Sequence, residues 1–312
     1  KLKGLLMIPR SLFAAARVIR SFRPMLALGV GGYVSGAAIL AARMMGVVCA
    51  IQEQNAAPGL ANRLLARVSR AVFVSFEEAA AAFPGAAKKG RALVVGNPVR
   101  KPILESLLQA GDRTGERSPE RVSILVVGGS QGARGLNRLF LGALREMPEP
   151  LRKKLKLRHQ SGERDFEEVC AQYRELGMEA RLEAFIEDMA AAYLEADLVV
   201  SRAGAGAVAE IALAGLPSVL VPYPFAAADH QAMNAQALVT AGAALMFREG
   251  ETDPGQMARA LAGLIESPAE RARMAAAARG AARPHAARDI VDHCLELMNA
   301  RPGRGAQCDG EK

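Results

Sequence analysis

The sequence predicts an α/β protein built from two doubly wound domains that face each other across a cleft. Short apolar runs rich in Val, Leu and Ala alternate with helical patterns along the chain. Such near-continuous apolar strands are typical of parallel sheets that helices cover on both faces. A length of 312 residues allows two domains that each bury a core. The predicted strands are Val47–Gln52, Ala71–Val74, Ala92–Val95, Val122–Val127, Leu157–Gln160, Arg181–Phe185, Leu198–Ser201, Ser218–Val221 and Ala244–Phe247.

The glycine-rich stretch Pro24–Ala42 predicts one more strand near the start of the chain. It is 19 residues long and uncharged, a length at which a transmembrane helix has to be considered. Its four glycines indicate instead a buried strand, a tight turn and a helix that begins near Val34. The prolines within Ile211–Ala228 argue against a membrane span there in the same way.

The segment Gly96–Arg100 predicts the joint between the two domains. We expect a front domain over residues 1–100 and a rear domain over 101–284. The helix predicted at 285–300 packs back onto the front domain, and residues 301–312 form a frayed tail.

Charge is concentrated in the front of the chain and predicts an anionic partner there. Residues 1–100 contain 14 basic and three acidic side chains, whereas residues 101–312 contain 26 basic and 29 acidic ones. An anionic membrane surface or a lipid phosphate fits this pattern. Nucleic acid is disfavoured, because aromatic residues make up 4% of the chain and Trp is absent. The four cysteines form no C-x-x-C pair, which disfavours a zinc site or disulfide framework and fits a reducing cytosol.

A glycine-rich turn follows the predicted strand Val122–Val127 and precedes a helix that begins near Gly135. Gly128, Gly129 and Gly132 allow the backbone to approach a ligand closely, and the amides of such a turn stabilise a phosphate. Ser130 and Gln131 add possible donors. The alternative is a βα turn with only a structural role.

Two further loops of the rear domain combine small and polar residues. In the segment 200–210 a strand ends in Ala and Gly residues, and Glu210 lies one to two turns into the next helix. A carboxylate there can accept two ribose hydroxyls, although a lone Glu is more often an ordinary surface residue. In the segment 221–234, Asp229, Gln231 and Asn234 can hold sugar hydroxyls, and His230 is either a base or a neighbour of the helix cap.

Two loops at the carboxyl edge of the front sheet carry the remaining candidates. One contains Gly31, Gly32 and Ser35, and the other begins at Glu53, the first acidic residue of the chain. A carboxylate at this edge is either an ion-pair partner or a general base beside a hydroxyl nucleophile.

The first 23 residues form a basic amphipathic segment. Arg10, Arg17, Arg20 and Arg23 accompany apolar residues at helical spacing. This pattern fits a surface helix packed on the core, but the absence of acidic residues before Glu53 favours contact with a membrane surface.

Seven motifs, taken together and in this order, resemble the MurG family. They are G-V-G-G-Y-V-S-G, E-Q-N-A-A-P-G-L-A-N, V-G-N-P-V-R, V-V-G-G-S-Q-G-A-R, F-I-E-D-M-A-A-A-Y, S-R-A-G-A-G-A-V-A-E and P-F-A-A-A-D-H-Q-A-M-N-A. The resemblance implies a GT-B fold and an inverting, metal-independent transferase without cofactor. It implies transfer of GlcNAc from UDP-GlcNAc to lipid I, which gives lipid II for peptidoglycan. It also implies a peripheral position on the cytoplasmic face of the bacterial membrane.

The resemblance also implies roles for individual residues. The positions that match UDP-GlcNAc contacts are Asn55, Arg100, Ser130, Ile186, Ala205, Gly206, Ala207, Val208, Ala209, Glu210 and Gln231. Those of the acceptor loop are Gly31, Gly32, Tyr33 and Ser35, and those of the membrane-facing patch are Leu6, Leu12 and Phe13. Glu53 remains the candidate base.

The sequence departs from the family pattern at its beginning. The family starts with a strand and a loop G-G-T-G-G-H, and we expect these to precede Lys1. We therefore expect the full-length natural protein to be the enzyme and this piece to be weak or inactive. A UDP-GlcNAc 2-epimerase, a glycolipid synthase and a non-catalytic nucleotide-sugar-binding or membrane-binding module are the alternatives.

Overall fold

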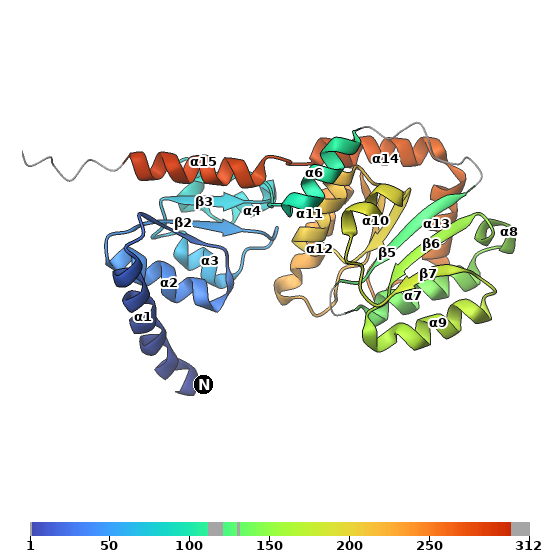
Figure 1. The fold of residues 1–312 in the computed structure, drawn as a ribbon, viewed down its shortest axis with the longest axis horizontal. Helices are drawn as coiled ribbons and strands as arrows, with labels where there is room; N and C mark the ends of the chain where they lie inside the picture. Colours follow the sequence, from blue (N-terminus) through green and yellow to red (C-terminus); the bar gives the residue numbers. More distant parts are fainter. Residues whose placement is uncertain (1, 112–120, 130–131, 301–312) are drawn as a thin grey trace, which may run out of the picture. The chain divides into compact units, whose positions relative to one another are not determined.

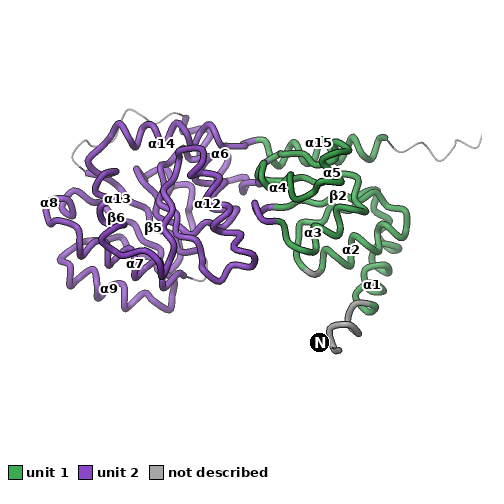
Figure 2. Tube along the Cα trace, turned by 180° about the vertical axis from the view of Figure 1, so that it is seen from behind, with its two compact units in different colours: residues 1–53, 58–95, 285–312 green, residues 54–57, 96–284 purple. Residues whose placement is uncertain are grey.

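The computed structural model describes residues 2–111, 121–129 and 132–300 (Figure 1). The chain divides into two compact units, drawn in green and purple in Figure 2. The first comprises residues 1–53, 58–95 and 285–312, and the second comprises residues 54–57 and 96–284. The first unit thus ends at Val95 and not at Arg100, because Gly96–Arg100 packs with the second unit. The tail predicted at 301–312 lies outside the described residues.

The first unit is a parallel sheet with helices on both faces. Its strands, in the order β1-β2-β3-β4 across the sheet, are β1 Leu26–Gly29, β2 Val48–Glu53, β3 Ala71–Val74 and β4 Ala92–Val94. Its helices are α1 Leu2–Phe22, α2 Gly32–Met44, α3 Leu60–Leu65, α4 Glu77–Ala81, α5 Pro84–Ala87 and α15 Ala286–Asn299. Helix α2 starts two residues before the predicted Val34, because Gly31 and Gly32 make the turn with φ of 92° and 79°.

Side chains of β2 and β3 alternate between two apolar layers. On one face Cys49 and Ile51 of β2 pack with Ile39 of α2. On the other face Phe73 of β3 packs with Ile290 of α15. Figure 1 shows α15 and α2 on opposite sides of this sheet. The C-terminal helix is therefore part of the core of the first unit.

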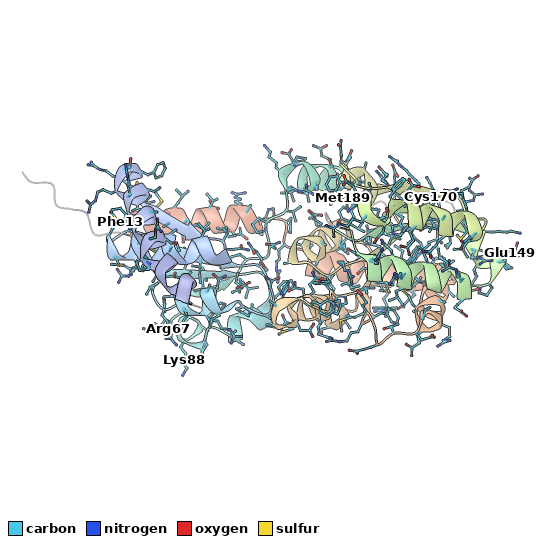
Figure 3. The ribbon with its side chains drawn as sticks, turned by 90° about the horizontal axis from the view of Figure 1, so that it is seen from below. Phe13, Arg67, Lys88, Glu149, Cys170 and Met189 are labelled. Carbon is cyan, nitrogen blue, oxygen red and sulfur yellow. The ribbon has the colours of Figure 1, made fainter. Side chains whose placement is uncertain are left out.

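Helix α1 packs along α2 with its apolar side. Ile19 is buried, and Leu12 is partly buried against the same core. Leu12, which the resemblance places in the membrane-facing patch, thus uses part of its side chain for packing on the core. Phe13 is 75% exposed (Figure 3). The side chain of Leu6 lies outside the described residues. No described helix is both long and apolar enough to cross a membrane.

The second unit contains a larger parallel sheet, in the strand order β10-β9-β8-β5-β6-β7. Its strands are β5 Val122–Val127, β6 Leu155–Gln160, β7 Ala180–Glu183, β8 Leu198–Ser201, β9 Ser218–Leu220 and β10 Ala244–Met246. Its α-helices are α6 Lys101–Ala110, α7 Arg134–Glu146, α8 Glu149–Arg152, α9 Phe166–Glu175, α10 Met189–Glu195, α11 Ala205–Ala214, α12 His230–Thr240, α13 Pro254–Glu266 and α14 Pro268–Ala281. Two short 3₁₀ helices are η1 Glu163–Asp165 and η2 Ala227–Asp229.

The order of these strands makes the sheet doubly wound. The chain runs outward from β5 through β6 to β7, and then returns to β8 on the other side of β5. Helices α7, α9 and α13 share one core, to which β5 contributes Ile124 and Val126. Helices α10 and α11 lie on the opposite face (Figure 1), where Leu125 points toward α10. The switch point between β5 and β8 is the place where ligands bind in open α/β sheets.

The predicted strands agree with the structure at three places and differ at their ends elsewhere. The ranges Ala71–Val74, Val122–Val127 and Leu198–Ser201 are confirmed residue for residue. Strand β7 ends at Glu183 and not at the predicted Phe185, although the Gly162 N–H still bonds to the carbonyl of Ala184 just beyond its end. The apolar runs therefore predicted the existence of the strands more accurately than the residues at which the strands begin and end.

A buried polar network ties β6 to α7 and α9. His159 is fully buried, with Nδ1 2.8 Å from the Tyr173 hydroxyl and Nε2 3.1 Å from Asn137 Oδ1. Asn137 Nδ2 donates to Ser161 O and to Asp165 Oδ2, which fixes Oδ1 as the atom that faces the imidazole. Nε2 therefore carries the proton, and Nδ1 accepts from Tyr173. Burial lowers the pKa of His159 to about 3.

Because His159 is neutral when folded, the stability of the second unit should fall at mildly acidic pH. Its pKa is lower in the folded than in the unfolded chain, so its contribution is complete above about pH 6.5 and is lost as the pH falls toward 3. Between pH 7 and 5 the loss should be about 2 kcal/mol. His159→Gln keeps a hydrogen-bond donor and an acceptor but does not titrate. Its free energy of unfolding should therefore not show this loss between pH 7 and 5.

Urea unfolding followed by tyrosine fluorescence measures this, because Tyr173, Tyr193 and Tyr223 belong to the second unit and the chain has no Trp. Parallel pH curves for the two proteins would contradict the neutral His159.

Candidate functional site

The carboxyl ends of the strands in the second unit gather most of the predicted donor-site residues. The parallel pairing of β5 with β6 and β8 brings the loops after these strands to one edge of the sheet. The glycine-rich turn after β5 and the small-residue segment after β8 therefore stand on either side of the switch point. This is the arrangement that the sequence predicted for these two segments.

The turn after β5 depends on its glycines. Gly129 and Gly132 have φ of 92° and 75°, a region that side chains rarely allow. A Cβ on Gly132 would also lie 2.9 Å from the carbonyl oxygen of Ser161. A Cβ on Gly128 would lie 2.7 Å from the Cβ atom of Ala133. The missing side chains at these glycines therefore let the turn pack closely against Ser161 and Ala133, directly before α7 begins at Arg134. Ser130 and Gln131 lie outside the described residues.

One buried side chain that the sequence analysis missed, Gln160 at the end of β6, joins two predicted contacts. Its Nε2 donates to the carbonyl of Gly129 at 2.8 Å, and its Oε1 accepts from the N–H of Ile186 at 3.0 Å. Ile186 itself is fully buried. The glycine-rich turn and the Ile186 segment are thus held together. The available signal was an uncharged polar residue at the carboxyl end of a predicted strand.

The segment after β8 presents the start of a helix lined with small residues. Gly204 is the N-cap of α11, and its position has no side-chain cap. Gly206 is exposed, while Ala205 and Val208 are buried and fix the helix against the unit. Ala207 and Ala209, the other two predicted contacts here, are half-buried. The first amides of an α-helix lack internal partners and favour an anion, so this helix end can receive a phosphate.

Glu210 lies on α11 between a tyrosine and an arginine. Its Oε2 accepts a hydrogen bond from the Tyr193 hydroxyl at 3.1 Å, and its Oε1 is 3.7 Å from Nη2 of Arg100. The carboxylate is largely buried, whereas the Arg100 side chain is 66% exposed. Burial raises the pKa of Glu210, and the Tyr193 hydrogen bond and the Arg100 charge oppose that rise. A carboxylate held in this way can accept further hydrogen bonds from a ligand.

The loop after β9 brings only part of the predicted sugar contacts to a surface. Gln231 is half-buried, and its Oε1 accepts from the N–H of Tyr223 at 3.0 Å. Asp229 pairs with Arg248 at 2.9 Å. The ring of His230 lies 2.8 Å from the carbonyl of Ala227, which fits the interpretation as a cap neighbour.

Asn234 was expected to bind sugar hydroxyls, but it holds the chain together instead. It is fully buried, its Oδ1 accepts from the N–H of Ala56, and its Nδ2 donates to the Asn55 side chain and to the carbonyl of Ala203. These bonds place the segment Gln54–Ala57 in the second unit, although it had been assigned to the front domain. Asn55 therefore lies beside the segment that leads into α11.

A buried ion pair near the start of α7 was also missed. Arg202, which is 8% exposed, donates to the carbonyls of Val221 and Pro222 and pairs with Glu249 at 2.5 Å. The Glu249 carboxylate lies so close to Gly135 that a Cβ there would require this side chain to move. The pair thus joins the loops after β8, β9 and β10 around the first turn of α7. The isolated Arg in a run of small residues was a possible signal.

In the first unit, the Glu53 side chain is buried and hydrogen-bonded to neighbouring residues. Its side chain is 3% exposed, and Oε2 accepts hydrogen bonds from Asn62 Nδ2 at 2.8 Å and from the N–H of Gly59 at 3.2 Å. These bonds tie the end of β2 to the start of α3. They favour an anchoring role for Glu53 over the role of general base, because a base has to reach a proton of the substrate.

The other front loop starts at the same sheet edge. Gly31 and Gly32 make the turn from β1 into α2, and the Ser35 hydroxyl donates to the carbonyl of Gly31 at 2.5 Å. The side chain of Tyr33 lies outside the described residues. Among residues 2–111, 121–129 and 132–300, no group of three or more His, Cys, Asp or Glu side chains is arranged to hold a metal ion.

Two family descriptions match the chain. The glycosyltransferase family 28 C-terminal domain matches residues 123–292, and the glycosyltransferase family 28 N-terminal domain matches residues 1–74. Together they cover most of both units.

Two similar proteins are each named UDP-N-acetylglucosamine–N-acetylmuramyl-(pentapeptide) pyrophosphoryl-undecaprenol N-acetylglucosamine transferase. The protein of Myxococcus xanthus is 42% identical over 95% of this chain and 75% of its own length. That of Pseudomonas paraeruginosa is 44% identical over 95% of this chain and 81% of its own length.

Solved structures agree with this assignment. The crystal structure of Acinetobacter baumannii MurG has a TM-score of 0.79 and 33% identity, over 93% of this chain and 80% of the other. A putative UDP-N-acetylglucosamine 2-epimerase from Listeria monocytogenes has a TM-score of 0.67 at 17% identity, over 93% and 80% of the two chains, and shares only the fold. The two parallel-sheet units are those of the α/β GT-B fold, and the chain belongs to glycosyltransferase family 28 and, within it, to the MurG family.

Proposed function

We propose that the chain transfers GlcNAc from UDP-GlcNAc to the MurNAc sugar of undecaprenyl-diphospho-MurNAc-pentapeptide (lipid I), which gives lipid II for peptidoglycan synthesis. The names of its relatives support this reaction. The observation that carries the proposal is the pair of small-residue turns at the switch point, with the carboxylate of Glu210 on helix α11, which follows the second turn.

The donor would lie along this edge of the second unit. The N-terminal ends of α7 and α11 suit its diphosphate, and the exposed guanidinium of Arg100 can pair with it. Glu210 accepts the ribose hydroxyls, and Gln231 meets the GlcNAc hydroxyls. The Ile186 N–H is used by Gln160, so its carbonyl is the backbone group for uracil. Phe185 beside it is 55% exposed and can stack on the base.

The reaction would be a direct displacement at the anomeric carbon of GlcNAc. A hydroxyl oxygen of the acceptor sugar attacks from the face opposite UDP, the bond from carbon to the diphosphate oxygen breaks, and UDP leaves. The hydroxyl proton passes to a general base, for which buried Glu53 is poorly placed. Amides of the helix ends and Arg100 stabilise the charge that develops on the diphosphate, so we propose that no metal ion is needed.

A contact with an anionic membrane surface is part of the proposal. Phe13 stands out from α1. Arg10 lies three residues before it, and Arg17 and Arg20 lie four and seven residues after it, which places all three on the same side of the helix. Basic side chains around an exposed aromatic ring suit the headgroup region of a membrane. The protein would then meet its lipid-linked acceptor from the cytoplasmic face as a peripheral protein, without a partner nucleic acid.

Replacing Glu210 should weaken donor binding. In a transfer assay with radiolabelled UDP-GlcNAc and a lipid I analogue, Glu210→Ala should raise KM for UDP-GlcNAc by about 10- to 100-fold, because a charged acceptor for hydroxyl groups is lost. Glu270→Ala is the matched control, because Glu270 also lies on a helix and pairs with an arginine, Arg273. Equal KM values for both variants would remove the ribose role of Glu210.

Transfer should not depend on divalent cations. We expect the same initial rate with excess EDTA and with added Mg²⁺, since the helix ends and Arg100 supply the positive charge. A rate abolished by EDTA and restored by Mg²⁺ would refute the metal-independent mechanism.

The basic face of α1 should determine binding to anionic vesicles. Arg17→Glu with Arg20→Glu should lower sedimentation with phosphatidylglycerol vesicles at least tenfold, because each basic residue contributes about 1 kcal/mol near such a surface. Lys88→Glu with Lys89→Glu makes the same change of charge elsewhere in the first unit and should have little effect. A similar loss in both variants would mean that only net charge matters.

A further inference from the structure

We propose that Tyr193 is a positioning residue for the donor: its hydroxyl fixes the Glu210 carboxylate in the orientation that receives the ribose hydroxyls. This inference rests on the proposed function, in which Glu210 meets the ribose. It assigns the selection of a ribonucleotide to a residue that does not touch the donor.

The contact between the two side chains is largely shielded from water. Tyr193 is 3% exposed and donates its hydroxyl proton to Oε2 of Glu210 at 3.1 Å. Burial raises the pKa of Tyr193 well above its usual value, so the hydroxyl stays protonated and remains a donor. A hydrogen bond to a charged acceptor is stronger than one between neutral groups.

Arg100 cannot fix the carboxylate in the same way. Its guanidinium is 66% exposed and stands 3.7 Å from Oε1, which is longer than a hydrogen bond. It is also the side chain proposed to bind the diphosphate. The first turn of α11 offers Glu210 no other polar side chain, because residues 205–209 are Ala, Gly, Ala, Val and Ala. Tyr193 is therefore the rigid partner of Glu210.

The hydrogen bond also keeps Glu210 suited to its task. Burial alone favours the protonated acid, and the bond from Tyr193 opposes this by stabilising the carboxylate. An ionised Glu210 can only accept hydrogen bonds. With Tyr193 on one side of Oε2, the remaining acceptor positions are aimed in a fixed direction, which suits two neighbouring hydroxyl groups of a ribose.

The helix that carries Tyr193 also begins beside Ile186, the proposed contact for the uracil base. Asp188 caps α10 by accepting from the N–H of Ala191 at 2.9 Å, and Ile186 lies two residues before that cap. Helix α10 therefore links the segment that meets uracil with the side chain that orients the ribose carboxylate. Base and ribose contacts are set by one short rigid element.

The test compares UDP with 2′-deoxy-UDP by calorimetry on the full chain. Wild type should bind UDP at least tenfold more tightly than the deoxy compound. Tyr193→Phe should weaken UDP binding about tenfold and 2′-deoxy-UDP binding less than twofold, so that the discrimination is largely lost. In the transfer assay the same variant should raise KM for UDP-GlcNAc and leave kcat within twofold.

Tyr173→Phe is the matched control. It removes another buried tyrosine hydroxyl of the same unit, which bonds to His159 and not to the donor site. It should keep the wild-type preference for UDP, even if it lowers stability by a similar amount. Equal losses of discrimination in both variants would overturn the proposal, because a general loosening of the unit would explain them.

The outcomes separate this inference from the proposed function. Wild type that binds no UDP refutes both. Wild type that discriminates, together with a folded Tyr193→Phe that still discriminates, refutes only the role of Tyr193. Should Tyr193→Phe fail to fold, NMR spectra of the wild-type protein labelled with ¹³Cζ-tyrosine test the role of Tyr193 instead. The Tyr193 signal, assigned with the other three Tyr→Phe variants, should move with UDP and much less with 2′-deoxy-UDP, and equal movement would overturn the proposal.

Discussion

The proposed donor site depends on one constraint: backbone amides at two turns of the same sheet edge have to stay open to an anion. Small residues meet this constraint. Gly128, Gly129 and Gly132 shape the turn after β5, and Gly204 begins α11 without a side-chain cap. Because the strands run parallel and the chain reverses its direction across the sheet between β5 and β8, both turns reach the same place. Larger side chains would fill the space that the diphosphate of a nucleotide sugar needs.

Around this opening, buried polar side chains hold the loops together. Gln160 joins the turn after β5 to Ile186, Asn234 holds the segment Gln54–Ala57, and Arg202 with Glu249 closes the first turn of α7. Each of these groups has hydrogen-bond or ion-pair partners, as burial requires. These contacts join the described parts of the loops before a ligand arrives, which lowers the entropy lost on binding.

Sequence reasoning found the parts of the fold and site that depend on local patterns. Apolar runs located the strands, and the glycine-rich turns, Glu210 and Gln231 followed from residue type and position. The parts that it missed depend on contacts between distant segments. Tyr193 and Glu210 are 17 residues apart, and Asn234 meets Asn55 across 179 residues. Leu12 was predicted in a membrane patch from the resemblance, and Glu53 was predicted as a base from its type and position. Only the structure shows that Leu12 packs partly on the core and that Asn62 and Gly59 donate hydrogen bonds to Glu53.

The two-sided hydrogen bonding of Gln160 has a consequence for nucleotide selection. The side-chain amide of Gln160 sets the separation between the glycine-rich turn after β5 and the Ile186 backbone. Neither segment can shift without disturbing a hydrogen bond to this amide. A nucleotide that binds as proposed has to span this fixed separation with its base and its first phosphate. A pyrimidine and a purine differ in their reach from the sugar, so the size of the base is read from a distance that one buried side chain maintains.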